Sequence, residues 1–169
     1  MAGKLAQLLD PARVLLDIQG GESSGALREV AGLLEGHPDV TDFAGFYRDL
    51  LARERLDSTC LGNEIAVPHA RTDGVRRNVL AIGRSAQGVL FENSMQTVRL
   101  IFVLGTPKSD PGGFLQLLSV LCRIFKDPRQ RADLLAAATP GDFVRVLVAA
   151  EARLLAPTVA GAPGRGPAP

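Results

Sequence analysis

The stretch Gly62-Asn63-Glu64-Ile65-Ala66-Val67-Pro68-His69-Ala70-Arg71 decides how this chain is interpreted. Ile65 and Val67 alternate with smaller or polar residues, as on a half-buried β-strand. Pro68 has a fixed φ and no N–H, and it pushes Val67 into the extended region, so it is typical of the end of a strand. The pattern predicts a rigid strand that ends at His69 and presents the imidazole at the edge of a sheet.

An imidazole held in this way can act as a nucleophile, a general base or a ligand. The other histidine, His37, lies in Gly36-His37-Pro38-Asp39 and is expected in an exposed turn without a functional role. His69 differs because Arg71 follows it closely and Arg53 precedes it. This combination suits the binding of an anion beside an imidazole, while a purely structural histidine is the alternative that the residues leave open.

Three polar residues before the histidine have two interpretations each. Thr59 and Asn63 are turn formers by default, but both can also donate hydrogen bonds to phosphate oxygens. Glu64 is expected to face outward from the predicted strand.

Length and composition limit the possible classes of protein. The chain has 169 residues, 46% of them hydrophobic, which is enough for one domain with a full core. A net charge of +1 gives no electrostatic reason to expect a nucleic acid partner. No stretch approaches the ~18 consecutive apolar residues of a membrane span, so membrane insertion is not expected. Without a secretory signal, Cys60 and Cys122 are expected to be reduced thiols in a cytoplasmic protein.

Hydrophobic spacing predicts strands and helices in a mixed order. Strands are expected over residues 13–18, 64–68, 79–85 and 98–104, and the last is nearly all apolar, as in a central strand covered on both faces. The predicted helices cover residues 3–9, 23–35, 41–55 and about 113–125, with two more beginning at Asp127-Pro128 and Thr139-Pro140.

This order of elements predicts the α/β class, with a three-layer α/β/α sandwich on a small mixed β-sheet. The domain is expected to span residues 1–155. Residues 156–169 are rich in Pro, Gly and Ala and carry a single charge, Arg165, so they are predicted to form a disordered tail.

Motifs for other chemistries are weak. Cys60 and His69 lack a second pair of ligands at zinc-like spacing, so no metal is expected. Ser58 and Ser119 lie outside any Gly-x-Ser-x-Gly elbow of a hydrolase. No GxxxxGK[ST] phosphate loop is present, so nucleotide binding by that route is not expected.

The run from Leu51 to Arg71 resembles the characteristic sequence of fructose/mannitol-type enzyme IIA domains of the bacterial phosphoenolpyruvate-dependent phosphotransferase system. That family includes nitrogen-related regulatory IIA proteins. The shared features are Arg53-Glu54, the pair Ser58-Thr59, Leu-Gly-Asn at residues 61–63, and Ile-Ala-Val-Pro-His ending at His69. The order of elements follows the family over roughly residues 5–150, which implies the same α/β/α sandwich.

The resemblance implies that His69 accepts a phosphoryl group from the carrier HPr, or from a paralogue, and passes it to a IIB domain or holds it as a regulatory signal. Arg53 matches the family arginine that neutralises phosphate charge, and Thr59, Asn63 and Arg71 are expected to contact the phosphate. Phosphoryl transfer needs positioning and charge stabilisation, and neutral imidazole, with a reference pKa of about 6.5, is a good nucleophile. Because a phosphohistidine stores transfer potential, no cofactor is expected.

One position departs from the family pattern. Many members carry a second histidine, just before a Leu, where this chain has Phe114-Leu115. In the family that histidine assists transfer or hydrogen-bonds the active-site imidazole, and it is not the phosphoacceptor. Its replacement therefore bears on rate and partner choice and motivates the hypothesis of a mainly regulatory protein. An alternative function is a non-catalytic regulatory interaction module on the IIA scaffold, which an exposed Phe114 would favour as a protein contact. A phosphohistidine hydrolase is the third interpretation, for which no general acid is apparent.

Overall fold

Two long antiparallel strands form the middle of a six-stranded sheet in the computed structural model, which describes residues 3–156. The strands are β1 (Val14–Leu15), β2 (Cys60–Gly62), β3 (Ile65–Ala66), β4 (His69–Thr72), β5 (Val79–Phe91) and β6 (Gln96–Pro107). β5 pairs antiparallel with β6 and parallel with β1. On its other side, β6 pairs in parallel with β3 and then β4, and β2 adds antiparallel to β3. The predicted small mixed sheet is confirmed.

Three of the five helices begin at capping residues that the sequence predicts. The helices are α1 (Ser23–Gly32), α2 (Phe43–Leu56), α3 (Pro111–Phe125), α4 (Pro128–Ala136) and α5 (Pro140–Leu155). Asp42, Asp127 and Thr139 are the N-caps of α2, α4 and α5, and each side chain accepts a hydrogen bond from a backbone N–H in the first turn. The helix predicted over residues 3–9 is instead a short 3-10 turn, Ala6–Leu8, followed by a second one at Pro11–Arg13.

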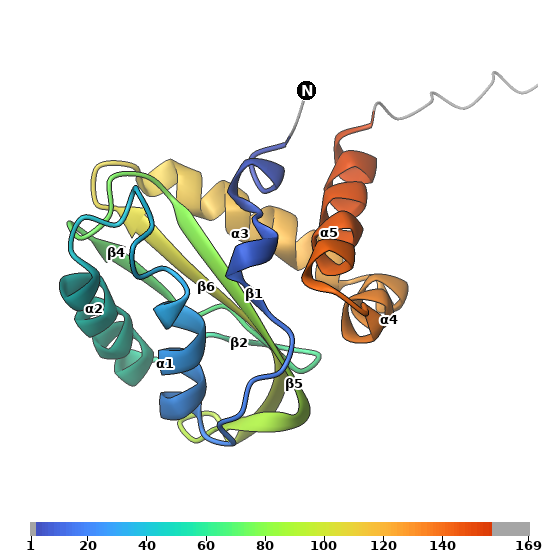
Figure 1. Ribbon diagram of the computed structural model, residues 1–169, viewed down its shortest axis with the longest axis horizontal. Helices are drawn as coiled ribbons and strands as arrows, with labels where there is room; N and C mark the ends of the chain where they lie inside the picture. The colour runs from blue at the N-terminus through green and yellow to red at the C-terminus, as the bar shows by residue number, and fades with distance from the viewer. Residues whose placement is uncertain (1–2, 157–169) are drawn as a thin grey trace, which may run out of the picture.

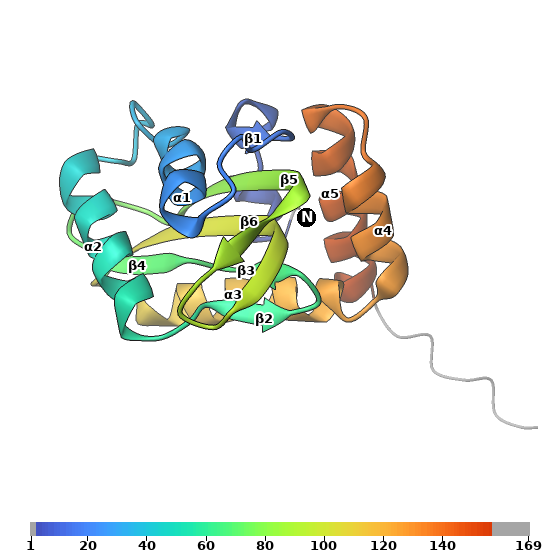
Figure 2. The same cartoon turned by 90° about the horizontal axis from the view of Figure 1, so that it is seen from below.

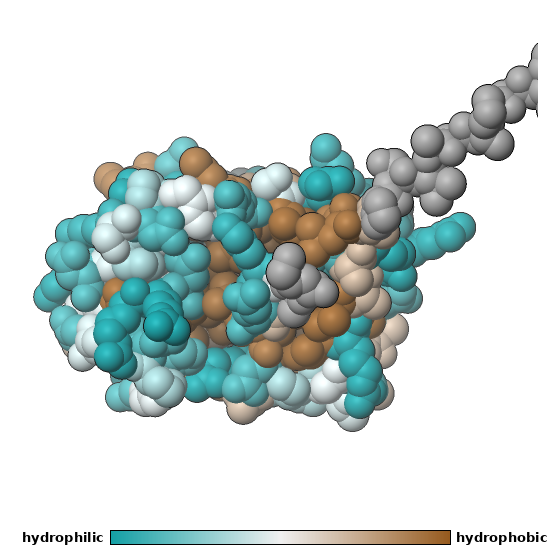
Figure 3. All heavy atoms as spheres, turned by 90° about the horizontal axis from the view of Figure 1, so that it is seen from above, coloured by the Kyte–Doolittle hydropathy of each residue, from teal (hydrophilic) through white to brown (hydrophobic). Residues whose placement is uncertain are grey.

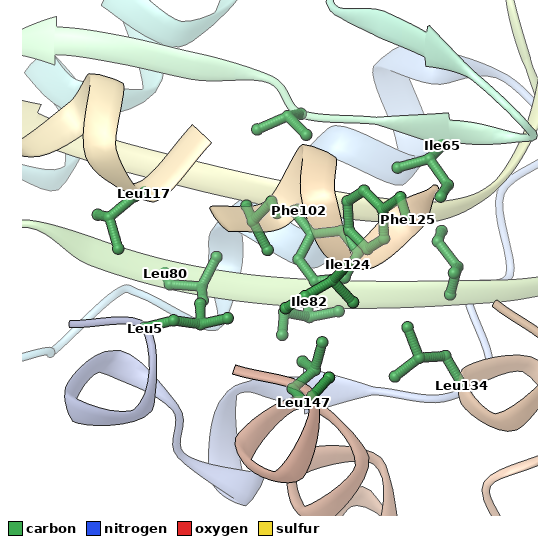
Figure 4. Close-up of a cluster of buried hydrophobic side chains, with 14 of the residues drawn as sticks. Leu5, Ile65, Leu80, Ile82, Phe102, Leu117, Ile124, Phe125, Leu134 and Leu147 are labelled. Carbon is green, nitrogen blue, oxygen red and sulfur yellow. The ribbon is translucent and has the colours of Figure 1, made fainter. Parts of the chain in front are cut away.

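The sheet is the middle of three layers. α1 and α2 lie on one side of it, and α3, α4 and α5 lie on the other (Figures 1 and 2). Alternate residues of β6 enter the two cores: Phe102 packs with α3, whereas Ile101 and Val103 pack with α1 and α2. Figure 4 shows the α3 side, where the ring of Phe125 lies 4.9 Å from that of Phe102, centroid to centroid. The predicted α/β/α sandwich is therefore confirmed, and a strand covered on both faces explains the apolar run.

Both central strands are longer than predicted. β5 continues past residue 85 because its register with β6 shifts between Arg84 and Val89, where Gly88 has a φ of 93°. Such a bulge lets a strand pass through polar residues that otherwise indicate a loop. β6 continues through Thr106 and Pro107, which pair with β4. By contrast, β1 covers only two of the six residues predicted for the first strand.

Of the strand predicted over residues 64–68, only Ile65–Ala66 forms a strand, β3. Asn63 and Glu64 form the two-residue turn between β2 and β3, and both have positive φ, as a type I′ hairpin requires. Glu64 is therefore a turn residue, not the strand residue predicted. Pro68, which has no N–H, separates β3 from β4, and pairing with β6 resumes at His69. His69 begins a strand on the edge of the sheet instead of ending one.

The first turn of the described chain is tied to α5 by a buried carboxylate. Glu151 is 2% exposed, and its two oxygens each accept a hydrogen bond of 2.9 Å, from the backbone N–H groups of Leu5 and Ala6. These bonds compensate for burying the charge. Figure 3 shows apolar surface gathered on this face, and the exposed large apolar residues of α5 are Val148 and Leu155. Of the disordered tail predicted over residues 156–169, residues 157–169 lie outside the described residues.

Candidate functional site

His69 lies in a hollow of about 330 Å³ between α2, β4 and the start of α3. α2 contributes residues at the spacing i, i+3, i+4, i+7, which places them on one helical face. The lining consists of Asp49, Ala52, Arg53 and Leu56 from α2, His69, Ala70 and Arg71 from β4, Lys108 from the following loop, and Phe114 from α3. The structure thus brings together three of the five predicted site residues: His69, Arg53 and Arg71.

Lys108 is a site residue that the sequence analysis missed. β4 and β6 are parallel, with Arg71 opposite Thr106 in the register, so the carboxyl ends of both strands meet at the same edge. The Arg71 guanidinium donates to the Lys108 carbonyl oxygen at 3.3 Å. Lys108 directly follows the end of β6. A sequence-based prediction that β4 and β6 pair in parallel would have placed Lys108 beside His69.

The imidazole of His69 has one nitrogen engaged by the backbone. Nδ1 lies 2.9 Å from the carbonyl oxygen of Val67. A carbonyl oxygen only accepts hydrogen bonds, so Nδ1 must carry the hydrogen. In the neutral ring, Nε2 then keeps its in-plane lone pair. The turn through Pro68 therefore sets the tautomer of His69 as well as its place.

The environment of His69 favours the neutral ring. Burial of the half-buried imidazole is the main effect that lowers its pKa below 6.5. The positive charge of Arg53 lowers the pKa further, while the hydrogen bond to Val67 raises it. Burial is the largest of these effects, so the net pKa is lowered. The ring is consequently available as a nucleophile or base at neutral pH.

The side chain of Phe114 covers one face of this imidazole. The two ring centroids are 4.4 Å apart and the rings are inclined by 29°, which is a stacked arrangement. Phe114 is only 9% exposed. The expectation of an exposed Phe114 available for protein contact is therefore wrong, because the ring is used inside the molecule. The large apolar side chains that are exposed near this site are those of Leu56, which is 83% exposed, and of Leu115, which follows Phe114 in α3 and is 63% exposed.

Positive charge dominates the lining of the hollow. Arg53, Arg71 and Lys108 contribute cations, and Asp49 is the carboxylate among the lining residues. Arg53 lies in the last turn of α2, where its guanidinium donates to the carbonyl oxygen of Asp57 at 2.9 Å. Asp49 accepts a 2.7 Å hydrogen bond from the hydroxyl of Thr72. The hollow is thus suited to an anion next to Nε2.

Thr59 and Asn63 do not line this hollow. Asn63 is exposed in the β2–β3 turn. Thr59 is buried, and its hydroxyl donates to Glu54 Oε2 at 2.7 Å. The Thr59 carbonyl accepts from the N–H of Val67 at 3.0 Å. A chain of hydrogen bonds therefore runs from Glu54 through Thr59 and Val67 to the imidazole of His69.

Glu54 is the unexpected member of that chain. It is buried at the end of α2, and burial raises the pKa of its carboxyl above 4.5, although the bonds from Thr59 oppose the shift. Its backbone carbonyl also accepts from the side-chain amide of Asn93 at 2.8 Å. Glu54 thus holds the helix end that carries Arg53 against the strands that carry His69. The sequence analysis used Glu54 only as part of the family pattern.

The remaining candidates lie elsewhere in the molecule. His37 is half-buried instead of exposed, and its Nδ1 accepts from the N–H of Asp39 at 2.9 Å. Cys60 and Cys122 are both free thiols. Across residues 3–156, no three His, Cys, Asp or Glu side chains converge as a metal site, and no helix there is long and apolar enough to cross a membrane.

A family model described as the phosphoenolpyruvate-dependent sugar phosphotransferase system, EIIA 2, matches residues 7–150. A nitrogen regulatory protein of Pseudomonas aeruginosa is 33% identical, over 86% of this chain and 95% of the relative. A fructose-like EIIA component of this system from Escherichia coli is 30% identical, over 73% of this chain and 80% of the relative.

Solved structures resemble the fold closely. The nitrogen regulatory protein IIA-Ntr from Neisseria meningitidis superimposes with a TM-score of 0.78 at 29% identity, covering 86% of this chain and 99% of the other. The mannitol IIA enzyme of Escherichia coli, solved in complex with phosphorylated IIB, has a TM-score of 0.71 at 19% identity, covering 83% and 97%, and supports the fold alone. This chain belongs to the EIIA 2 family of the phosphoenolpyruvate-dependent sugar phosphotransferase system.

Proposed function

We propose that this protein is a phosphoryl carrier of the phosphotransferase system, phosphorylated on Nε2 of His69. An HPr-type carrier donates the group, and the protein passes it to a IIB domain or holds it as a regulatory signal in the cytoplasm. The observation that carries the proposal is the Nδ1 contact with the Val67 carbonyl, because it leaves the Nε2 lone pair free inside a cationic hollow. We assign the function to one domain, with residues 1–155 as its proposed bounds.

The transfer needs no group beyond the two proteins. The Nε2 lone pair attacks phosphorus while the donor's N–P bond breaks, and the electrons of that bond return to the donor nitrogen. The hydrogen on Nδ1 stays in place, donating to the Val67 carbonyl. The imidazole ring therefore gains positive charge as the new N–P bond forms, and the phosphoryl oxygens bring negative charge into the hollow.

Arg53 and Arg71 are proposed to bind that negative charge. Both line the hollow next to His69, and Arg53 is half-buried, where an ionic contact is screened less than at the surface. Donors that are already in place stabilise developing charge without reorganisation. Thr59 is not included, since its hydroxyl is bound to Glu54, and neither is Asn63, which lies outside the hollow.

The names of the relatives support both outcomes for the phosphoryl group. One relative is a nitrogen regulatory protein, and another is a fructose-like EIIA component. A multiphosphoryl transfer protein of Escherichia coli O157:H7 is 32% identical over 80% of this chain and 36% of its own length. A regulatory or a transport role is therefore compatible with the same chemistry at His69.

The direct test is phosphorylation in a reconstituted chain. The protein is incubated with phosphoenolpyruvate, enzyme I and HPr, and separately with a nitrogen-branch HPr paralogue in place of HPr. We expect one acid-labile phosphate per wild-type molecule from at least one donor, detected by intact mass. His69→Ala should accept none. Labelling that survives this substitution would assign the phosphate to another residue and overturn the proposal.

Exposed Leu56 and Leu115 favour a second function, a regulatory interaction module that works without phosphorylation. Binding to a purified IIB domain or regulatory target can separate the two functions. Equal affinity of the partner for wild type, for phosphorylated wild type and for His69→Ala would support the interaction module. An affinity that changes only on phosphorylation would support the carrier.

A further inference from the structure

Phe114 lies in the first turn of α3, directly after a capped and closely packed glycine. The Asp110 carboxylate caps this helix by accepting from the N–H of Gly113 at 3.1 Å. Gly113 packs so closely that an added Cβ would lie 2.9 Å from the side-chain amide nitrogen of Asn78. The residue directly after this glycine is Phe114, so its ring enters the site from the hydrogen-bonded first turn of α3.

The stack leaves the reactive nitrogen open. The Nε2 lone pair lies in the plane of the imidazole, whereas Phe114 covers the face of the ring. Two restraints then act on His69: the Val67 carbonyl limits rotation of the ring at Nδ1, and Phe114 limits its tilt. A nucleophile restrained in both respects loses less orientational freedom in the transition state.

The phenyl ring also interacts with charge. The face of an aromatic ring attracts a cation placed over it. His69 is close to neutral before transfer and gains positive ring charge during it, so the attraction is stronger in the transition state and product than in the free protein. Only an interaction that strengthens in this way accelerates the chemical step.

We propose that Phe114 is a positioning residue for His69, which holds the imidazole by stacking and stabilises the positive ring charge that phosphoryl transfer creates. The proposal rests on the proposed function of His69. A phenyl ring has no N–H or O–H, so it offers the phosphoryl group no hydrogen bond. Binding of the phosphoryl oxygens is left to the cations of the hollow.

The first arm of the test is spectroscopic and needs no phosphate. Phe114→Leu keeps an apolar side chain but loses the π face, and Phe114→Tyr keeps both the ring and the stack. Phe125→Leu is the matched control, because it makes the same change in the same helix against Phe102. In ¹H–¹³C spectra, the His69 ring protons should lose their ring-current shift only in Phe114→Leu. The pKa of His69 should also fall in that variant and stay unchanged in Phe114→Tyr.

The second arm measures phosphoryl exchange with the donor. We expect Phe114→Leu to accept phosphate about tenfold more slowly at saturating donor, with the donor KM unchanged. The equilibrium should shift about threefold or more toward the phosphorylated donor. Phe114→Tyr and Phe125→Leu should match wild type in both measurements.

The outcomes separate this proposal from the proposed function. Unchanged His69 ring-proton shifts in Phe114→Leu would show that the two rings do not stack in solution and would overturn the positioning role. Changed shifts with unchanged rate and equilibrium would overturn the positioning role while leaving His69 as the acceptor. Failure of wild type to accept phosphate from either donor would overturn the proposed function and the positioning role together, whatever the spectra reveal about the stack.

Discussion

The two histidines of this protein lie next to prolines, and in both of them Nδ1 is bound to the backbone, yet they are chemically opposite. In His69, Nδ1 faces a carbonyl oxygen and must donate, so the lone pair is on Nε2. In His37, Nδ1 accepts from the N–H of Asp39, so the lone pair is already used and Nε2 carries the hydrogen. A neutral His37 therefore has no free nucleophilic nitrogen.

This difference teaches that a lowered pKa is not sufficient to mark a reactive histidine. Burial is the largest effect that lowers the pKa of each ring, and a nearby arginine lowers it further in both, Arg53 for His69 and Arg13 for His37. The rings differ in which nitrogen the backbone occupies and in what surrounds the other. Only His69 has a stacked aromatic ring and the cationic hollow beside it.

The most severe test of this comparison removes each ring in turn. His37→Ala should accept phosphate at the wild-type rate, whereas His69→Ala should lose acceptance completely. Intact mass after incubation with phosphorylated HPr measures both. Slower acceptance by His37→Ala in a protein with an unchanged thermal unfolding curve would show that the two sites are coupled.

Removing the arginine beside His69 should have the next largest effect. We expect Arg53→Ala to slow phosphoryl acceptance about a hundredfold, as for the loss of one preorganised donor to developing charge. Arg55→Ala is the matched control, because Arg55 lies in the same last turn but outside the hollow. Quench-flow measurement of both variants gives the ratio. Equal rates for the two would contradict the role of Arg53.

The hydrogen-bond chain that leads to His69 can be tested through stability. Thr59→Val leaves the buried carboxyl of Glu54 without this partner and should cost about 1–3 kcal/mol of unfolding free energy. Thr41→Val, near His37, is the control. It removes the 3.2 Å hydrogen bond that the exposed Thr41 hydroxyl donates to the Gly74 carbonyl, and it should cost less than about 1 kcal/mol of unfolding free energy. Urea unfolding compares them. A smaller loss for Thr59→Val than for Thr41→Val would show that the chain is not a stabilising feature.

The smallest effect concerns pH. The folded pKa of His69 lies below 6.5, so the unfolded state binds more protons as the pH falls from 6.5 toward that value. Stability should decrease with falling pH across this window, and His69→Gln should remove part of the decrease.

The rate of phosphoryl acceptance should also depend on pH through His69. It should stay constant as the pH falls to 6.5 and begin to decrease only nearer the folded pKa of His69, and it should not follow the titration of His37. NMR titration of both rings assigns the two pKa values, and Arg53→Gln should raise only that of His69.

Much of the site was predictable because it is local in the sequence. Arg53, Pro68 and His69 lie within one short segment, and the strand-ending character of Pro68 follows from its missing N–H. The helix starts at Asp42, Asp127 and Thr139 were predictable for the same reason, since a capping side chain bonds within its own first turn.

The features that were not predicted depend on partners far away in the chain. β4 exists because β6 continues to Pro107 and offers it a parallel partner. Phe114 is buried because α3 brings it over His69, and no local pattern distinguishes that position from an exposed one. The hydroxyl of Thr59 is taken by Glu54, a contact that exists only once the end of α2 is packed against the sheet.

The position of His69 at the first residue of β4 has a further consequence. Its backbone is in register with Leu104 of the central strand, and Leu104 donates to the Pro68 carbonyl at 2.9 Å, so the main chain around the imidazole is fixed against β6. Because the Nδ1 hydrogen is retained, a phosphoryl group would add one net negative charge there, on a backbone that is held against β6. Carrier and phosphorylated carrier should then have the same shape. A partner that tells them apart must therefore recognise a change in electrostatic potential, and its discrimination should weaken as ionic strength rises.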